Sequence, residues 1–244
     1  MHIRMATADD YPAIVNIHNS LNIVWPEAPR TPQGWAEADR NRNPKYKFQR
    51  WVAVKDGGVV GFGSYGQYSG DYHPQRFYVA VEVSPGYQRQ GVGAGLFNQI
   101  MAGLQPFDPR VLRAYAFTNL PQGFPFLQKR GFYEAFRETP VHLDIAAFDP
   151  SPYADLEAKL LEKGIVIKTL REMESDPGRD RKIYDLYWEA TEDLPQEEPP
   201  LQKPDFAEWV QWGLNDPTIL PDAFFIAVFG ERVRWLAGIG QRSG

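Results

Sequence analysis

The hydrophobic pattern along residues 1–146 switches between two periods. Apolar residues at every second position predict strands, and apolar residues three or four positions apart predict helices. The predicted strands cover 2–5, 50–55, 59–65, 76–84, 111–117, 132–136 and 141–145. The predicted helices cover 11–21, 33–41, 91–104 and 122–130. This order predicts an α/β fold of the α+β kind, in which helices flank one mixed central sheet.

Part of this pattern occurs a second time. The segment WVAVKDGGVVGFGSYGQ, residues 51–67, aligns without gaps on FIAVFGERVRWLAGIGQ, residues 225–241, and Trp35 maps onto Trp209 at the same displacement. A repeat of this length indicates a second structural unit. Few residues follow the second copy, so we expect it to lack a phosphate loop of its own, either as a degenerate half-domain or as part of a shortened chain.

Three parts of the chain are expected from these patterns. A complete unit covers 1–146, a linker with a short helix covers 147–164, and an incomplete unit of the same kind covers 165–244. An incomplete sheet leaves a strand edge open to pairing with the first unit or with another protomer. We therefore expect a homodimer.

Composition excludes several classes of function. The 244 residues include no cysteine, which rules out disulfides, thiolate metal sites and a cysteine nucleophile. The four histidines show no paired spacing, so we expect no metal. A net charge of -5 argues against nucleic-acid and anionic-membrane partners. With no secretory signal and no long apolar run, a cytoplasmic location is expected.

A glycine-rich loop connects a predicted strand to a predicted helix in VEVSPGYQRQGVGAGLF, residues 81–97. The N–H groups at a helix start are unpaired and glycines permit close approach, so this arrangement favours a phosphate ligand. It fits neither of the two best-known phosphate loops. Val92 and Gly93 stand where a P-loop needs Lys and Ser or Thr, and Leu96 stands at the third glycine position of the dinucleotide fingerprint.

Two blocks of the first unit resemble the GCN5-related N-acetyltransferases, the GNAT family. The first is Val83-Ser84-Pro85 followed by QRQGVG, residues 88–93, in place of the family's (Q/R)xxGxG loop. The second is Asn119 followed by FPFLQKRGF, residues 124–132. The resemblance implies a mostly antiparallel sheet flanked by helices. It also implies an acetyl-CoA-dependent N-acetyltransferase that transfers the acyl group directly to a primary amine of a small molecule in a ternary complex.

The resemblance further implies a coenzyme A site. Val81 and Val83 would pair with the amides of pantetheine, and Pro85, which has no N–H, ends the strand ladder beside them. Asn119 matches a position that contacts coenzyme A, although Asn-Leu-Pro also suits an Asx turn. The diphosphate would be held by the loop and helix start, at Gln88, Arg89, Gln90, Gly91, Val92, Gly93 and Ala94. A solvated surface role remains open for Arg89.

Acetyl transfer to an amine requires a base more than an acid. Deprotonating an amine of pKa ~10.4 at pH 7 requires about 4.6 kcal/mol, whereas a thiolate of pKa ~8.5 requires about 2 kcal/mol. Glu82, near the end of an apolar strand, is the candidate base because burial would raise its pKa; a structural ion pair is the alternative. Tyr78 shares its face of the strand and is the candidate to orient a relay water.

The position of the family's usual general acid differs in this sequence. Leu127 stands where many members carry a tyrosine that acts as general acid. Tyr115 and Tyr133 are the candidates to replace it, and packing roles are open for both. His73 is a further candidate at the border of the acceptor site. A non-catalytic acyl-CoA-binding sensor or scaffold is the alternative function.

Overall fold

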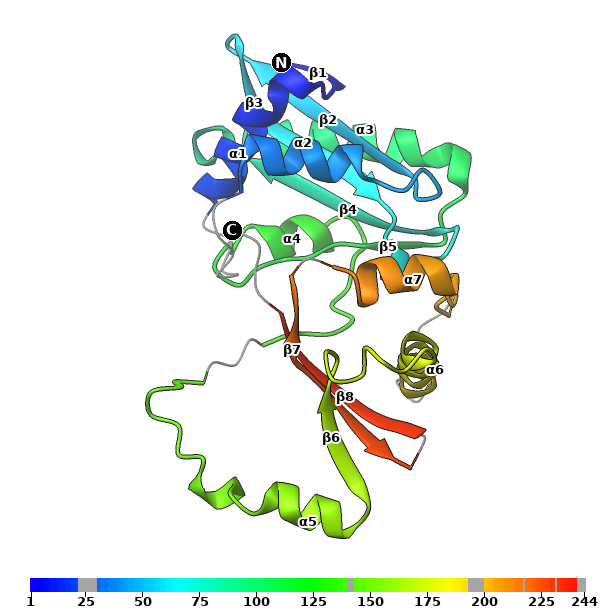
Figure 1. Ribbon diagram of the computed structural model, residues 1–244. Coiled ribbons are helices and arrows are strands. Elements are labelled where there is room, and N and C mark those ends of the chain that lie inside the picture. Colours follow the sequence, from blue (N-terminus) through cyan, green and yellow to red (C-terminus); the bar gives the residue numbers. More distant parts are fainter. Residues whose placement is uncertain (22–29, 140–142, 193–199, 217, 231, 241–244) are drawn as a thin grey trace. The chain divides into compact units, whose positions relative to one another are not determined.

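Two compact units make up the protein. The computed structural model describes residues 1–21, 30–139, 143–192, 200–216, 218–230 and 232–240, with only the backbone for 234–240 (Figure 1). The first unit contains the described residues up to Tyr133 together with 200–202, and the second contains the remainder. None of the described helices is long and apolar enough to cross a lipid bilayer.

The first unit is built on a five-stranded sheet in the order β1-β2-β3-β4-β5. Neighbouring strands are antiparallel except β4 and β5, which are parallel, so the expected mixed and mostly antiparallel sheet is confirmed. Asp56 and Gly57 form the β2–β3 turn with φ angles of 54° and 81°, as a tight hairpin requires. The strands are β1 (His2–Met5), β2 (Phe48–Lys55), β3 (Gly58–Gly66), β4 (Arg76–Val83) and β5 (Val111–Arg113).

Helices cover both faces of this sheet (Figure 1). Val52 packs with Ile14 of α1 on one face, whereas Trp51 and Ala53 belong to the cluster formed with α3 on the other. This alternation follows from the two-residue period of a strand. The helices are α1 (Tyr11–Ser20), α2 (Pro32–Arg40), α3 (Val92–Leu104) and α4 (Gly123–Gln128), and 3-10 turns cover Ala8–Asp10, Ser69–Asp71, Pro85–Tyr87 and Gln105–Phe107.

The sheet opens between β4 and β5. The two strands pair only over Arg76–Tyr78, while β4 continues to Val83. The Ser84 N–H donates to Val60 O of β3 at 3.0 Å. Because backbone groups of a strand alternate in direction, those of Val81 and Val83 point away from β3, into the opening. β4 therefore presents a stretch of open backbone edge.

Three sequence-based element predictions are corrected. The strand expected over 111–117 ends at Arg113, and the strand expected over 132–136 does not form. Tyr133 and Phe136 are 84% and 53% exposed, and a strand requires a partner edge that alternation alone cannot supply. The strand expected over 141–145 falls partly outside the described residues, and 143–145 are not in a strand.

The second unit contains a three-stranded antiparallel sheet in the order β6-β7-β8. Ile183, Trp188, Trp209 and Ile226 lie in its buried core. The strands are β6 (Ile165–Thr169), β7 (Ile219–Phe229) and β8 (Arg232–Gly240), and the helices are α5 (Leu156–Glu162), α6 (Arg179–Glu192) and α7 (Phe206–Gly213), with a 3-10 turn over Ser151–Tyr153.

The hairpins of the two units have the same register near their turns, over Trp51–Lys55 and Phe225–Phe229, whereas β7–β8 has a further shift between Ile219 and Phe224. The β2–β3 pairing shifts between Ala53 and Val54, and the β7–β8 pairing shifts between Ala227 and Val228, the positions that align in sequence. Both hairpins also follow a strand and two helices along the chain. The bulge is a structural detail that the sequence alignment did not include.

Candidate active site

A cavity of about 1330 Å³ lies in the first unit, where β4 and β5 separate. It is lined from both sides of the sheet. Of the residues expected at the site, Gln90, Val92 and Asn119 are not among those that line it; Val92 is instead buried in the core with 1% exposure. The expected residues that do line it are Tyr78, Val81, Glu82, Val83, Gln88, Arg89, Gly91, Gly93 and Ala94.

The glycine-rich loop reaches the cavity at the start of α3. Arg89 and Gly91 have φ angles of 61° and 85°, and Gly91 is the N-cap, which has no side chain to bond the first helical N–H groups. The first bond across this turn runs from Gly95 N to Gly91 O at 3.0 Å, so the N–H groups of residues 92–94 precede the helical ladder. These groups form a site suited to an anion.

Side chains of the same loop fix its shape. Gln88 Nε2 donates to Val83 O at 3.1 Å, and Gln90 Nε2 donates to Gly86 O at 2.9 Å. Lys55 Nζ donates to Gln90 Oε1 at 2.7 Å. Because the Val83 carbonyl is occupied by Gln88, the donors and acceptors that β4 offers to a ligand are centred on Val81 and the Val83 N–H.

Positive charge gathers at this end of the cavity. Lys129 and Arg130, which follow α4, line it together with Arg89. The Arg130 guanidinium lies 3.6 Å from the Phe126 ring centroid, and its Nη1 donates to Phe126 O at 2.8 Å. In the sequence, Lys129 and Arg130 were noted only as part of FPFLQKRGF, and no role was predicted for either of them. Their signal was their place in the second block that resembles the family.

Glu82 lies at the other side of β4, against α1. His18 Nδ1 lies 2.9 Å from Glu82 Oε2 and 3.1 Å from Oε1, with 21% and 17% of the two side chains exposed. The His18 ring packs against Trp35 of α2 at 5.7 Å between centroids. Both His18 and Glu82 line the cavity. His18 was not predicted as a site residue. The one feature of the sequence that distinguishes it is its place in the last turn of the predicted helix.

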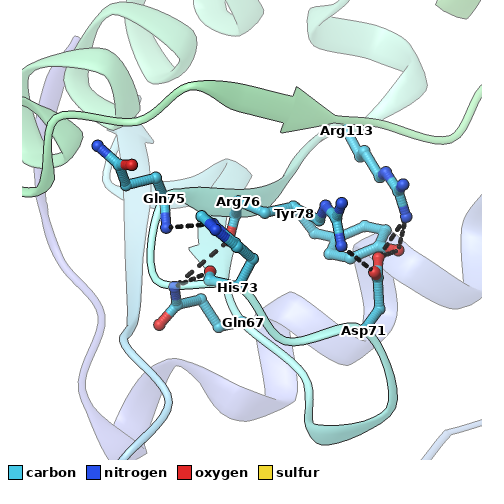
Figure 2. Close-up of polar contacts among 7 residues, drawn as sticks. All are labelled: Gln67, Asp71, His73, Gln75, Arg76, Tyr78 and Arg113. Atoms are coloured by element: carbon cyan, nitrogen blue, oxygen red, sulfur yellow. Dashed lines mark hydrogen bonds and ion pairs between the residues drawn. The ribbon is translucent and has the colours of Figure 1, made fainter. Parts of the chain in front are cut away.

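Tyr78 belongs to a hydrogen-bonded network around Asp71 (Figure 2). The Tyr78 hydroxyl donates to Asp71 Oδ2, which also accepts from Arg113 Nη1. Arg76 Nη1 donates to Asp71 Oδ1 at 2.6 Å, and Arg113 Nη1 donates to the Tyr78 hydroxyl at 3.1 Å. Burial, with the Asp71 hydrogen bond, raises the pKa of Tyr78 far above its usual 10.0. Tyr78 therefore stays protonated at neutral pH, and its proton is held by Asp71.

The loop that carries Asp71 is held by its own side chains (Figure 2). Gln67 Nε2 donates to the carbonyls of His73 and Pro74 at 3.0 and 3.2 Å. His73 Nδ1 accepts from the Gln75 N–H at 3.1 Å, and burial together with Arg76 lowers the His73 pKa. His73 is not among the residues that line the cavity. Its observed contact organises the loop.

The candidates for the acid step differ in position. Leu127 and Tyr115 line the cavity, whereas Tyr133 does not and is 84% exposed. The Tyr115 and Tyr78 rings stack at 6.1 Å with an interplanar angle of 12°. Of the two tyrosines, Tyr115 is the one that reaches the site.

One protein-family model and several solved structures are similar to this chain. Residues 47–136 match the family model described as an acetyltransferase (GNAT) domain. Similar solved structures include a ribosomal-protein-alanine N-acetyltransferase from Brucella melitensis, at 24% identity over 56% of this chain and 86% of that chain (TM-score 0.48). Others are an N-acetyltransferase from Staphylococcus aureus Mu50, at 21% over 55% and 84% (0.47), and an aminoglycoside 6'-N-acetyltransferase from Acinetobacter haemolyticus, at 16% over 59% and 99% (0.45). Through the match at 47–136, this chain carries an acetyltransferase domain of the GNAT family.

Proposed function

We propose that the first unit is an acetyl-CoA-dependent N-acetyltransferase that acts on a primary amine of a small molecule. The observation that carries the proposal is the open edge of β4. It leads directly to the uncapped start of α3, and Glu82 projects from the same strand toward α1. One strand thus lies between a site for an extended thioester and a site for its acceptor.

The residues present fit coenzyme A. The Val81 backbone would bond the pantetheine amides, as the next strand of a sheet does, and the Val83 N–H would face the thioester. The N–H groups at the start of α3 would hold the diphosphate, and Gly91, with no heavy atom within 4 Å of an added Cβ, leaves space for it. Arg89, Lys129 and Arg130 would bond phosphate oxygens.

Acetyl-CoA supplies the acyl group: the amine nitrogen bonds its carbonyl carbon, the C–S bond breaks, and an amide and a free thiol result. An ammonium acceptor loses two protons overall, one before attack and one as the amide forms. Glu82 takes the first, directly or through a water, and the second leaves on the thiol. The Val83 N–H donates to the thioester oxygen as negative charge develops there.

His18 assists Glu82 by holding its carboxylate. With Nδ1 as the donor, both carboxylate oxygens are within hydrogen-bonding distance of one ring nitrogen, which limits rotation of the side chain. A base that is fixed in position transfers protons more efficiently than a mobile one. Tyr78, whose hydroxyl proton is bound to Asp71, would hold a relay water only as an acceptor. Tyr115 is our candidate to relay the second proton: it would protonate the thiolate and regain a proton from the nitrogen as the amide forms.

We also propose that the second unit is an incomplete copy of the first. The shared bulge position, the pairing of β6 with β7 as of β1 with β2, and the matching places of Trp35 in α2 and Trp209 in α7 support a common origin. The limits 1–146 and 165–244, joined by 147–164, stay a prediction, and the compact units divide earlier, after Tyr133.

Two measurements test the function. Thermal unfolding with increasing coenzyme A or acetyl-CoA should shift to higher temperature, because a ligand of the native state stabilises it. Release of free thiol from acetyl-CoA should then depend on an added primary amine. Binding without amine-dependent thiol release would reject catalysis, and the lack of any thermal shift would reject the cofactor.

A further inference from the structure

Three tyrosines line one wall of the cavity, in the part where we expect the acceptor to bind. They are Tyr68, Tyr78 and Tyr115, here called the tyrosine wall. The Tyr68 and Tyr78 rings meet edge to face at 5.1 Å, and Tyr115 stacks on Tyr78. Tyr68 and Tyr115 are 50% and 60% exposed. Exposed aromatic rings that gather on a cavity wall mark a surface for an apolar or aromatic ligand.

The distance from Glu82 to this wall sets the length of the ligand. Tyr78 and Glu82 lie on one face of β4, four residues apart, which separates their Cα atoms by about 13 Å at ~3.3 Å per residue. Ala80 lies between them on the same face, is exposed, and lines the cavity. An amine placed at Glu82 therefore reaches the rings only through a linker of several bonds, which the small Ala80 side chain accommodates.

The charges around the wall do not favour a second ammonium group. Asp71, whose carboxylate accepts a hydrogen bond from Tyr78, forms ion pairs with Arg76 and Arg113. The two positive charges of these arginines exceed the single negative charge of Asp71. Arg30 adds another positive charge to the cavity lining. The Arg113 guanidinium lies 5.9 Å from the Tyr78 ring centroid. It therefore already makes the cation–π interaction that a ligand cation could otherwise make with this ring. A polycationic acceptor would thus meet like charge.

We propose that the acceptor is a primary amine linked by a short flexible chain to an uncharged aromatic or apolar body, and that the tyrosine wall selects this body. The inference rests on the proposed N-acetyltransferase function and names its substrate class. Ring stacking supplies the selectivity, since aromatic pairs add attraction beyond the area they bury.

Acceptor kinetics test the proposal through thiol release from acetyl-CoA with 4-phenylbutylamine, n-butylamine, spermidine and kanamycin. We expect kcat/KM for 4-phenylbutylamine to exceed that for n-butylamine and for spermidine by about tenfold. Tyr68→Ala should lower the value for 4-phenylbutylamine by about three- to tenfold and that for n-butylamine much less, because Tyr68 belongs to the wall and has no proposed part in the proton transfers. Tyr68→Phe, which keeps the ring, should keep the preference.

A matched control is Tyr133→Ala, because Tyr133 is exposed and outside the cavity lining; it should not alter the preference. Higher kcat/KM for spermidine or kanamycin would overturn the inference, as would equal losses for both monoamines in Tyr68→Ala. Either result would leave the N-acetyltransferase function standing. Thiol release with none of the four amines would instead overturn the proposed function, and the substrate class with it.

Discussion

His18 of α1 and Glu82 of β4 are 64 residues apart in the chain, yet His18 Nδ1 lies 2.9 Å from Glu82 Oε2 at the cavity. The contact forms because the last turn of α1 crosses the end of β4, where the strand is about to leave the sheet. It gives the candidate base a fixed orientation.

Glu82→Gln should lower kcat by about a hundredfold or more, the usual contribution of a general base. The amide has nearly the same shape as the carboxylate but cannot take a proton from the acceptor. The KM for acetyl-CoA should change little, because coenzyme A is expected at the open edge of β4. Steady-state rates across pH 6–9 check this, and an unaltered kcat with an unaltered pH profile would remove Glu82 from the mechanism.

His18→Leu should lower kcat by about tenfold, since Glu82 loses its partner but keeps its carboxylate. Acetyl-CoA binding, measured by calorimetry, should be retained. His18→Asn places an amide donor near the position of Nδ1 and should restore part of the rate. Equal rates for the Leu and Asn variants would show that the hydrogen bond to Glu82 is not what His18 contributes.

Gly91→Glu should abolish coenzyme A binding, because it places a negative charge and added volume at the expected diphosphate site. The backbone contributes too: with φ at 85°, any other residue there is strained by about 1–2 kcal/mol. Gly91→Ala carries this strain without the charge and should bind with an intermediate affinity. Unchanged affinity of the Glu variant would contradict the site, and circular dichroism establishes that both variants are folded.

Asp71→Ala should lower the free energy of unfolding of the first unit by about 3 kcal/mol. The reason is Arg76, whose side chain is 1% exposed and would lose its carboxylate. A suitable control is Asp222→Ala, which breaks an exposed pair with Arg171 and should change stability little. Urea denaturation measures both, and similar small effects would mean that solvent readily compensates Arg76.

Asp10 should make stability depend on pH in the acid range. The Arg4 guanidinium, helped by bonds from Thr7, lowers the Asp10 pKa from 3.8 to about 2. The unfolded state therefore takes up this proton first, so the contribution of Asp10 is complete above about pH 4 and is lost as pH falls toward 2. Asp10→Asn should show a weaker decline of the unfolding midpoint across this window.

The neighbouring variant Asp9→Asn is the control, because Asp9 is exposed at the same turn. It should keep the decline seen in the wild-type protein. Identical pH profiles for Asp10→Asn and the wild type would show that the Arg4–Asp10 pair does not contribute to acid sensitivity.

Features that depend only on neighbouring residues could be predicted from the order of amino acids. The alternation of apolar residues over 50–55 and 59–65 predicted β2 and β3, the apolar spacing after Gly91 predicted α3, and all three formed as expected. The loop 88–93 indicated an anion site at a helix start because uncapped N–H groups and glycine backbone angles are properties of a few consecutive residues.

Contacts between side chains that are distant in the chain could not be predicted in this way, because they depend on the folded arrangement. The pairing of His18 with Glu82, and of Asp71 with Arg113 across 42 residues, depends on how helices and loops cross the sheet, and hydrophobic period carries no information about that crossing. The same holds for β5, which the sequence extended to 117. Its alternation persists beyond Arg113, but a strand exists only where a neighbour pairs with it, and at that point β4 and β5 separate.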